Sequence, residues 1–269
     1  MDVPAYLERI EYDGPLAPSL DTLRALHRSH QLAVPFENLD IHLGHPISLD
    51  EAALFEKIVL RRRGGFCYEL NAAFAALLRE LGFSVTYLSA RVARKDGGYS
   101  QEFDHLTLLV HLADGEDGKD QGPGLGSAPT PTRWLADVGY GDSFREPLRL
   151  DEVAVQEEPG GAYRIESEGI HRIVWQRQDD GQWDRNYCFT LQPRRLQDFA
   201  EMCRYHQTSP ESGFTKKRIC TQAMPGGRIT LSDTRLIITE HGNQVEQPVN
   251  GEAEYQKLLR ELFGLELMS

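Results

Sequence analysis

Cysteine is scarce in this sequence, and its spacing argues against several classes of protein. The 269 residues contain only four cysteines, at positions 67, 188, 203 and 220, and no two of them form a Cys-x-x-Cys pair. Disulfide-rich extracellular scaffolds and structural zinc sites need more cysteines, or closer ones. We therefore expect four free thiols, a reducing compartment and no bound metal.

Positive charge and long apolar runs are also lacking. The chain has 29 Lys and Arg against 41 Asp and Glu, a formal net charge of −12, which disfavours nucleic acid or an anionic membrane as partner. No apolar run approaches the length that spans a bilayer, and the first residues lack the basic and apolar segments of a signal peptide. The hydrophobic fraction of 40% is that of a globular protein. We expect a cytoplasmic protein; its oligomeric state is not indicated.

Cys67 lies in the stretch 63–71 (RGGFCYELN), between a Gly-Gly turn and an amphipathic helix that Gly82 ends. The apolar stripe of that helix consists of Leu70, Ala73, Phe74, Leu77, Leu78 and Leu81. Cys67 lies outside the stripe, in the first turn, where unpaired backbone N–H groups and the helix dipole favour a thiolate. This position predicts a reactive nucleophile, although an inert buried thiol stays an alternative.

A reactive thiolate needs a base and a group that orients the base. Residues 105–112 (HLTLLVHL) and 134–141 (WLADVGYG) have the alternation of two strands. A hairpin of these strands would bring His105 beside Asp137, a carboxylate in an otherwise apolar run that needs a partner. Cys67, His105 and Asp137 therefore form a candidate triad, although each residue alone also has an ordinary structural explanation.

Several stretches, in this order along the chain, resemble the arylamine N-acetyltransferase family. They are 34–41 (VPFENLDI), 63–71, 105–110, 137–141, 189–194 (FTLQPR) with Asp198-Phe199, and 208–214 (TSPESGF). The resemblance runs from about Tyr6 to the C-terminal helix. It implies an α+β fold with a helical N-terminal bundle (1–83), an antiparallel β-barrel (84–194) and a C-terminal α/β lid (195–269). The triad would lie between the first two, in a core like that of transglutaminases and cysteine proteases.

The resemblance also implies an activity. An acetyl group would move from acetyl-CoA to Cys67 and then to an aromatic amine or hydrazine, with acetyl-CoA as co-substrate and no permanently bound cofactor. The implied residues are Cys67, His105 and Asp137 for catalysis, Phe36, Tyr68, Tyr140 and Tyr187 for the acceptor pocket, and Gly97, Gly98 and Ser212 near CoA. Among the pocket residues, Tyr187 is the expected donor to the oxyanion.

Three other functions stay open from the sequence. A related amide synthase would close an acyl chain onto an aromatic amine. A transglutaminase-like or cysteine-protease-like hydrolase would use the same three residues without CoA. A non-catalytic binding module would have an inert Cys67.

Two further segments carry expectations. The triplet Arg61-Arg62-Arg63 is expected to be a solvated charge run rather than a phosphate site. Residues 113–132 are rich in Gly, Pro and Asp, which predicts a mobile loop. Because CoA is anionic and the chain is acidic, any CoA site needs a local positive patch.

Overall fold

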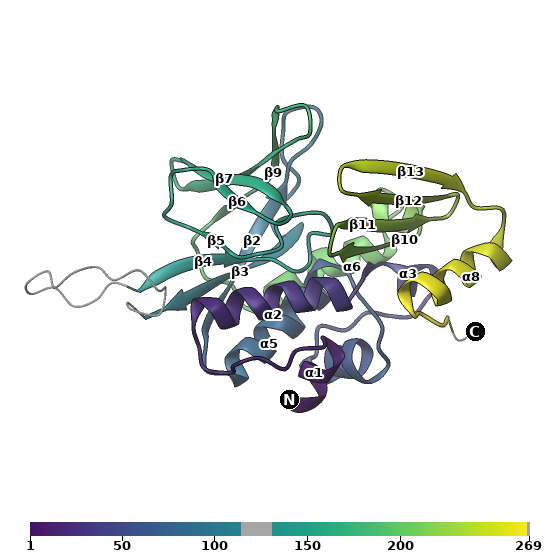
Figure 1. The fold of residues 1–269 in the computed structure, drawn as a ribbon, viewed down its shortest axis with the longest axis horizontal. Coiled ribbons are helices and arrows are strands. Elements are labelled where there is room, and N and C mark those ends of the chain that lie inside the picture. The colour runs from purple at the N-terminus through teal and green to yellow at the C-terminus, as the bar shows by residue number, and fades with distance from the viewer. Residues whose placement is uncertain (114–130, 268–269) are drawn as a thin grey trace, which may run out of the picture.

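The computed structural model describes residues 1–113 and 131–267, so the loop predicted at 113–132 lies outside the described residues except at its ends. The first eighty residues are mainly helical: α1 (Val3–Arg9), α2 (Leu20–Ala33), α3 (Leu39–Leu43), α4 (Glu51–Phe55), the π-helical turn η1 (Glu56–Leu60) and α5 (Cys67–Glu80). Figure 1 shows α1, α2 and α5 together on one side of the molecule. None of the helices in the described ranges combines the length and hydropathy of a membrane-crossing segment.

An eight-stranded antiparallel sheet follows, with the order β5-β4-β3-β2-β9-β8-β7-β6. Its strands are β2 (Ser84–Val92), β3 (His105–Leu112), β4 (Thr132–Ala136), β5 (Leu148–Arg149), β6 (Gln156–Glu158), β7 (Gly161–Glu168), β8 (His171–Arg177) and β9 (Trp183–Thr190). The Gln156 side chain bonds both backbone groups of Arg149, at 2.7 and 3.0 Å. Because this amide links the two edge strands, the sheet is nearly closed into the predicted barrel.

A second antiparallel sheet has the order β1-β10-β11-β12-β13. It contains β1 (Phe36–Glu37), β10 (Ile219–Met224), β11 (Gly227–Ser232), β12 (Arg235–Glu240) and β13 (Asn243–Pro248). The accompanying helices are the 3₁₀ turn η2 (Leu196–Phe199), α6 (Ala200–Thr208), α7 (Gly213–Lys216) and α8 (Glu252–Phe263). Strand β1 comes from the N-terminal part and pairs with β10, so this sheet joins the N-terminal and C-terminal parts of the chain. The division at 83/84 and 194/195 stays a prediction.

The packing of β3 decides where the site forms. Its even-numbered residues, Leu106 to Leu112, join the core shared with α5, whereas Leu109 lies in the core inside the barrel. The alternation predicted for this strand is therefore confirmed. The helix predicted after the Gly-Gly turn is α5, but residues 67–78 are buried on every side, so α5 is a central helix and not an amphipathic one. Because α5 lies against β3, the N-terminus of the helix meets the first residues of the strand.

Candidate active site

Cys67 begins α5 and is 4% exposed. The preceding turn is held by Glu69, whose carboxylate accepts the backbone N–H of Phe66 at 3.1 Å. Burial raises the pKa of the Cys67 thiol, and the charges of Asp104 and Asp137 raise it further, while a backbone hydrogen bond from Leu106 opposes them. The helix terminus alone, which the sequence suggested would favour a thiolate, is therefore outweighed by burial, and ionisation needs a base.

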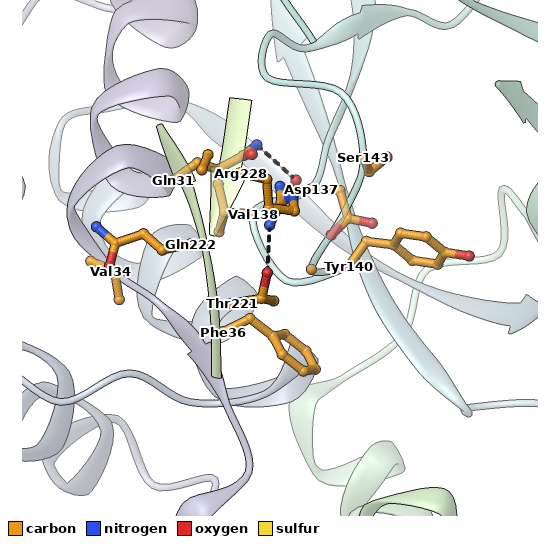
Figure 2. Close-up of a pocket in the computed structure, with 12 residues that line it drawn as sticks. Gln31, Val34, Phe36, Asp137, Val138, Tyr140, Ser143, Thr221, Gln222 and Arg228 are labelled. Atoms are coloured by element: carbon orange, nitrogen blue, oxygen red, sulfur yellow. Dashed lines mark hydrogen bonds between the residues drawn. The ribbon is translucent and has the colours of Figure 1, made fainter. Parts of the chain in front are cut away.

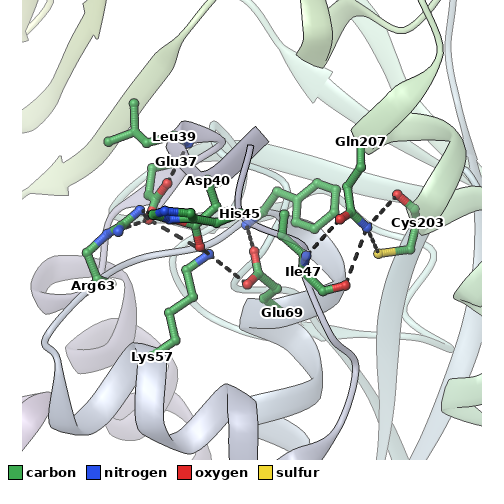
Figure 3. A network of polar contacts seen from close by, with 11 residues as sticks. Glu37, Leu39, Asp40, His45, Ile47, Lys57, Arg63, Glu69, Cys203 and Gln207 are labelled. Carbon is green, nitrogen blue, oxygen red and sulfur yellow. Dashed lines mark hydrogen bonds and ion pairs between the residues drawn. The ribbon is translucent and has the colours of Figure 1, made fainter. Parts of the chain in front are cut away.

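A buried ionic network supports the turn before Cys67 (Figure 3). Lys57 contacts Glu69 at 2.7 Å and Asp40 at 2.8 Å, and Arg63 contacts Glu37 at 2.7 Å and Asp40 at 3.0 Å. Burial raises the pKa of Glu69 to about 7 even beside Lys57. Arg63 is thus a structural ion-pair partner, which corrects the expectation of a wholly solvated triplet. The reason is that Glu37 on β1 and Asp40 on α3 both lie against it.

His105 and Asp137 form a short, fully buried contact. His105 Nε2 lies 2.6 Å from Asp137 Oδ2. Since a carboxylate only accepts, Nε2 carries the proton and Nδ1 is left as the acceptor of the ring. Burial alone would raise the pKa of Asp137, but the His105 charge and hydrogen bonds from Asn71 and Gly139 lower it. Asp137 is therefore an ionised carboxylate that orients the imidazole.

The strand predicted over 134–141 is shorter than expected. Strand β4 ends at Ala136, and Asp137 is the first residue of the loop that follows. This loop approaches α5 closely at Gly139. A Cβ on Gly139 would lie 2.8 Å from Cys67 Cα and 2.7 Å from Asn71 Nδ2. Only glycine allows the loop to lie this close to the nucleophile.

Asn71, one helical turn after Cys67, joins the three segments of the site. Its Nδ2 donates to Leu106 O at 2.7 Å and to Asp137 Oδ1 at 2.9 Å, and its Oδ1 accepts the N–H of Val138 at 3.0 Å. The side chain is fully buried. Asn71 belongs to the 63–71 stretch, but no role for it was predicted from the sequence. The signal available there is its i, i+4 spacing from Cys67.

His27 on α2 holds Asp137 from the other side. Its Nε2 accepts the backbone N–H of Asp137 at 3.0 Å, and its Nδ1 bonds Arg145 O at 2.9 Å. Burial lowers the pKa of His27 to about 4, so the ring is neutral with its proton on Nδ1. Gln31 also donates to the Asp137 carbonyl, at 3.4 Å, as Figure 2 shows. No sequence pattern pointed to His27, because its partner lies 110 residues away.

Cys67 and His105 open into one cleft of about 580 Å³. The elements around it are β1, α5, the ends of β2 and β3, the loop after β4, and the segment from α6 to β10. The aromatic, charged and hydroxyl side chains that line it include Phe36, Arg94, Asp104, Tyr140, Tyr205, His206, Ser212, Phe214 and Lys217. The aromatic side chains Phe36, Tyr140, Tyr205 and Phe214 form part of the wall of this cleft, and Arg94 and Lys217 are its Arg and Lys residues.

Comparison with known proteins identifies the family. Residues 19–269 match the family model described as N-acetyltransferase. The chain is 34% identical to the arylamine N-acetyltransferase of Escherichia coli over 263 residues, which is 97% of this chain and 87% of that protein. The chain belongs to the arylamine N-acetyltransferase family. It is accordingly an acyltransferase, as the sequence predicted.

Solved structures of this family agree with the fold. A Mycobacterium smegmatis arylamine N-acetyltransferase superimposes with a TM-score of 0.87 at 32% identity, covering 99% of this chain and 93% of that one. The Mycobacterium marinum enzyme, solved in complex with CoA, gives 0.85 at 31% identity, covering 98% and 92%. The mixed architecture with a barrel-like antiparallel sheet is therefore shared across the family.

The aromatic residues suggested by the family resemblance divide into two groups. Phe36 and Tyr140 line the cleft. Tyr68 is fully buried, and its hydroxyl proton is shared between the carbonyls of Phe103 at 2.7 Å and Asp104 at 3.1 Å. Tyr187 is also fully buried, and its ring centroid lies 5.2 Å from that of His105. Neither Tyr68 nor Tyr187 is among the residues that line the cleft.

Of the residues that the resemblance suggests for CoA, one lines the cleft and two do not. Ser212 lines the cleft, where its hydroxyl begins α7 by accepting the N–H of Phe214. Gly97 and Gly98 form the exposed turn after β2, and Gly97 O accepts a bond from Arg185. This turn lies outside the set of lining residues, but Arg94, to which Gly98 O is bonded, belongs to it.

Proposed function

We propose that this chain is an arylamine N-acetyltransferase that transfers an acetyl group from acetyl-CoA to aromatic amines or hydrazines through acetyl-Cys67. The observation that supports this most directly is the shared cleft. Cys67 and His105 both line it, and Asp137 contacts the far nitrogen of His105 at 2.6 Å. The family of the chain supplies the reaction class.

The first half-reaction loads the enzyme. His105 Nδ1 takes the proton of the Cys67 thiol, and the resulting imidazolium is stabilised by Asp137. The thiolate attacks the thioester carbonyl of acetyl-CoA. The tetrahedral intermediate then collapses, expelling CoA, which takes the proton from His105 and leaves acetyl-Cys67.

The second half-reaction transfers the acetyl group from Cys67 to the acceptor. The nitrogen of the aromatic amine attacks the acetyl carbonyl, and His105 takes the proton from that nitrogen. The Cys67 thiolate leaves and the amide departs. Phe36, Tyr140 and Phe214 offer aromatic surface for the ring of the acceptor. Such a wall also keeps water from the thioester until the amine arrives.

The donor site needs positive charge in an acidic protein. Arg94 and Lys217 are exposed side chains of the cleft, and they are the residues we propose for the CoA phosphates, with Ser212 beside them. The exposed Gly97-Gly98 turn would lie beside the same ligand. The packing of Tyr187 against His105 supports a role in holding the imidazole, and its role as an oxyanion donor stays a prediction. The lid function of residues 195–269 stays a prediction as well.

Mass spectrometry tests the proposal. With acetyl-CoA and no acceptor, we expect one acetyl group on the peptide that contains Cys67, with release of free CoA. Addition of an aromatic amine or a hydrazine should discharge it. C67S should lower acetyl transfer by several orders of magnitude, whereas C188S, at a cysteine in β9, should retain it.

The alternatives give different outcomes. Steady hydrolysis of amide substrates, with no reaction of acetyl-CoA, would indicate a hydrolase. Loading by long acyl thioesters but not by acetyl-CoA would indicate an amide synthase. A Cys67 as slow toward iodoacetamide as the other three cysteines would contradict any role as nucleophile.

A further inference from the structure

A second imidazole–carboxylate pair lies in the same cleft. Asp104 directly precedes β3, and its Oδ1 lies 3.1 Å from Nε2 of His206 on α6. The other nitrogen of His206, Nδ1, lies 3.0 Å from Ser212 Oγ. All three residues line the cleft with Cys67. Neither the sequence motifs nor the proposed mechanism gives Asp104 or His206 a task.

The surroundings of His206 suit a doubly protonated ring. Nδ1 is hydrogen bonded to Ser212 Oγ, which has two lone pairs and uses one for the N–H of Phe214. Nε2 is buried, makes no hydrogen bond, and has Asp104 Oδ1 at an ion-pair distance of 3.1 Å. The ring is otherwise enclosed by aromatic side chains, with centroids 5.1 Å from Phe214, 5.5 Å from Tyr205 and 6.1 Å from Tyr68. Phe214 and Tyr205 meet the His206 ring edge to face.

The negative charge of Asp104 opposes ionisation of the Cys67 thiol unless a positive charge neutralises it. After burial, its negative charge is the next largest influence raising the pKa of Cys67, ahead of Asp137. Burial by itself would raise the pKa of Asp104, but the neighbouring His206 and Ser100 side chains lower it. Asp104 is therefore held as a carboxylate close to a sulfur that must also become negative.

The other ionisable groups facing this pair or the thiol come from several elements. They are Tyr68 from α5, Cys203 and Tyr205 from α6, His105 from β3, Asp137 and Asp142 from the loop after β4, and Arg94, Glu211 and Lys217 around the cleft. Among them, His105 is already paired with Asp137. Among these groups, His206 is the one whose nitrogen lies 3.1 Å from an Asp104 oxygen.

We propose that His206 is a positioning residue for acyl transfer, which neutralises Asp104 and thereby allows His105 to deprotonate Cys67. The inference rests on the proposed function, because it assumes that Cys67 acts as a thiolate. It assigns to a residue of α6 a task that is exerted through Asp104. The ionisation of the nucleophile then depends on contacts from the C-terminal part of the chain.

The test is the pH dependence of Cys67 alkylation by iodoacetamide, followed by mass spectrometry of the Cys67 peptide. In H206Q, an amide can still donate to Asp104 but cannot carry charge. The midpoint of the alkylation rate against pH should therefore rise by about one pH unit. In D104N the midpoint should fall by a similar amount. The double variant should behave like D104N, because His206 acts through Asp104. H171Q makes the same substitution at the first residue of β8, outside the residues that line the cleft, and as a control it should leave the midpoint unchanged.

An unchanged or lower midpoint in H206Q would overturn the proposal, as would a higher midpoint in D104N. Should H206Q fail to fold, ring nitrogen chemical shifts of the wild-type protein decide the question. They should be those of a doubly protonated His206 at the pH where Cys67 reacts, and a neutral ring there would overturn the proposal. Alkylation requires neither acetyl-CoA nor an acceptor. Loss of acetyl transfer with the expected midpoints would therefore count against the proposed function alone.

Discussion

Replacing Asn71 by alanine should damage the site without touching any of the three reacting groups. The side chain makes three hydrogen bonds, to Leu106 O, to Asp137 Oδ1 and from the N–H of Val138. It thereby joins α5, β3 and the loop that carries Asp137. In N71A the Leu106 carbonyl, the Asp137 carboxylate and the Val138 N–H each lose the hydrogen bond to Asn71 in the buried interior.

The magnitude follows from what is left unsatisfied. Asp137 Oδ1 still accepts the N–H of Gly139 at 3.0 Å, so the loss falls mainly on the Leu106 carbonyl and the Val138 N–H. A buried backbone group that loses its partner costs about 1–3 kcal/mol, which gives about 4 kcal/mol for the pair. In a chain of this size the melting temperature should fall by roughly 10 °C.

Activity should fall further than stability accounts for. Asn71 helps to lower the pKa of Asp137, so N71A raises that pKa and the carboxylate becomes protonated at a higher pH. We expect the acid limb of the kcat/KM profile to move to higher pH. A loosened Asp137 also disorients His105, and a loss of about 100-fold in kcat/KM is expected at neutral pH.

The chain offers a closely matched control in Asn38. This side chain is also buried, donates to the carbonyls of Phe214 and Lys217 and accepts the N–H of Ile219. N38A should cost a similar free energy of unfolding but leave the acid limb unmoved, because Asn38 does not contact Asp137. If N71A and N38A lost equal stability and had the same pH profile, the reasoning about Asn71 would be refuted.

The remaining predictions concern a buried imidazole and a close backbone approach. The pKa of His27 is about 4 in the folded protein against about 6.5 in the unfolded chain. The stability it contributes is therefore full above pH 6.5 and lost as the pH falls toward 4, by about 3 kcal/mol. Between these pH values, the free energy of unfolding measured with urea should change less with pH in H27Q than in the wild type. Equal slopes of that free energy against pH would contradict this assignment. G139A should destabilise the protein by about 1–3 kcal/mol and slow Cys67 alkylation, because its Cβ would lie 2.8 Å from the Cys67 backbone. G213A, with nothing within 4 Å of its Cβ, should melt and react like the wild type, and equal effects of the two changes would argue against a steric cause.

The sequence by itself determined the elements that carry the reacting groups. An apolar stripe with a helical period and a closing glycine was enough to predict α5 with Cys67 in its first turn. Strict alternation was enough to predict β3, beginning at His105. Both signals are local, because helix and strand periods depend on residues a few positions apart. The family resemblance supplied the barrel, which no local pattern could have closed.

Tertiary structure decided how these groups are held. Asp137 lies in a loop and not in a strand, since Gly139 packs against the backbone of Cys67. The contacts that fix it come from Asn71 and from His27, which are 66 and 110 residues distant in sequence. Burial, which depends on the whole fold, sets the pKa values of Cys67 and His27. Such long-range contacts leave no periodic trace in the chain, and for this reason the supporting residues emerged only from the structure.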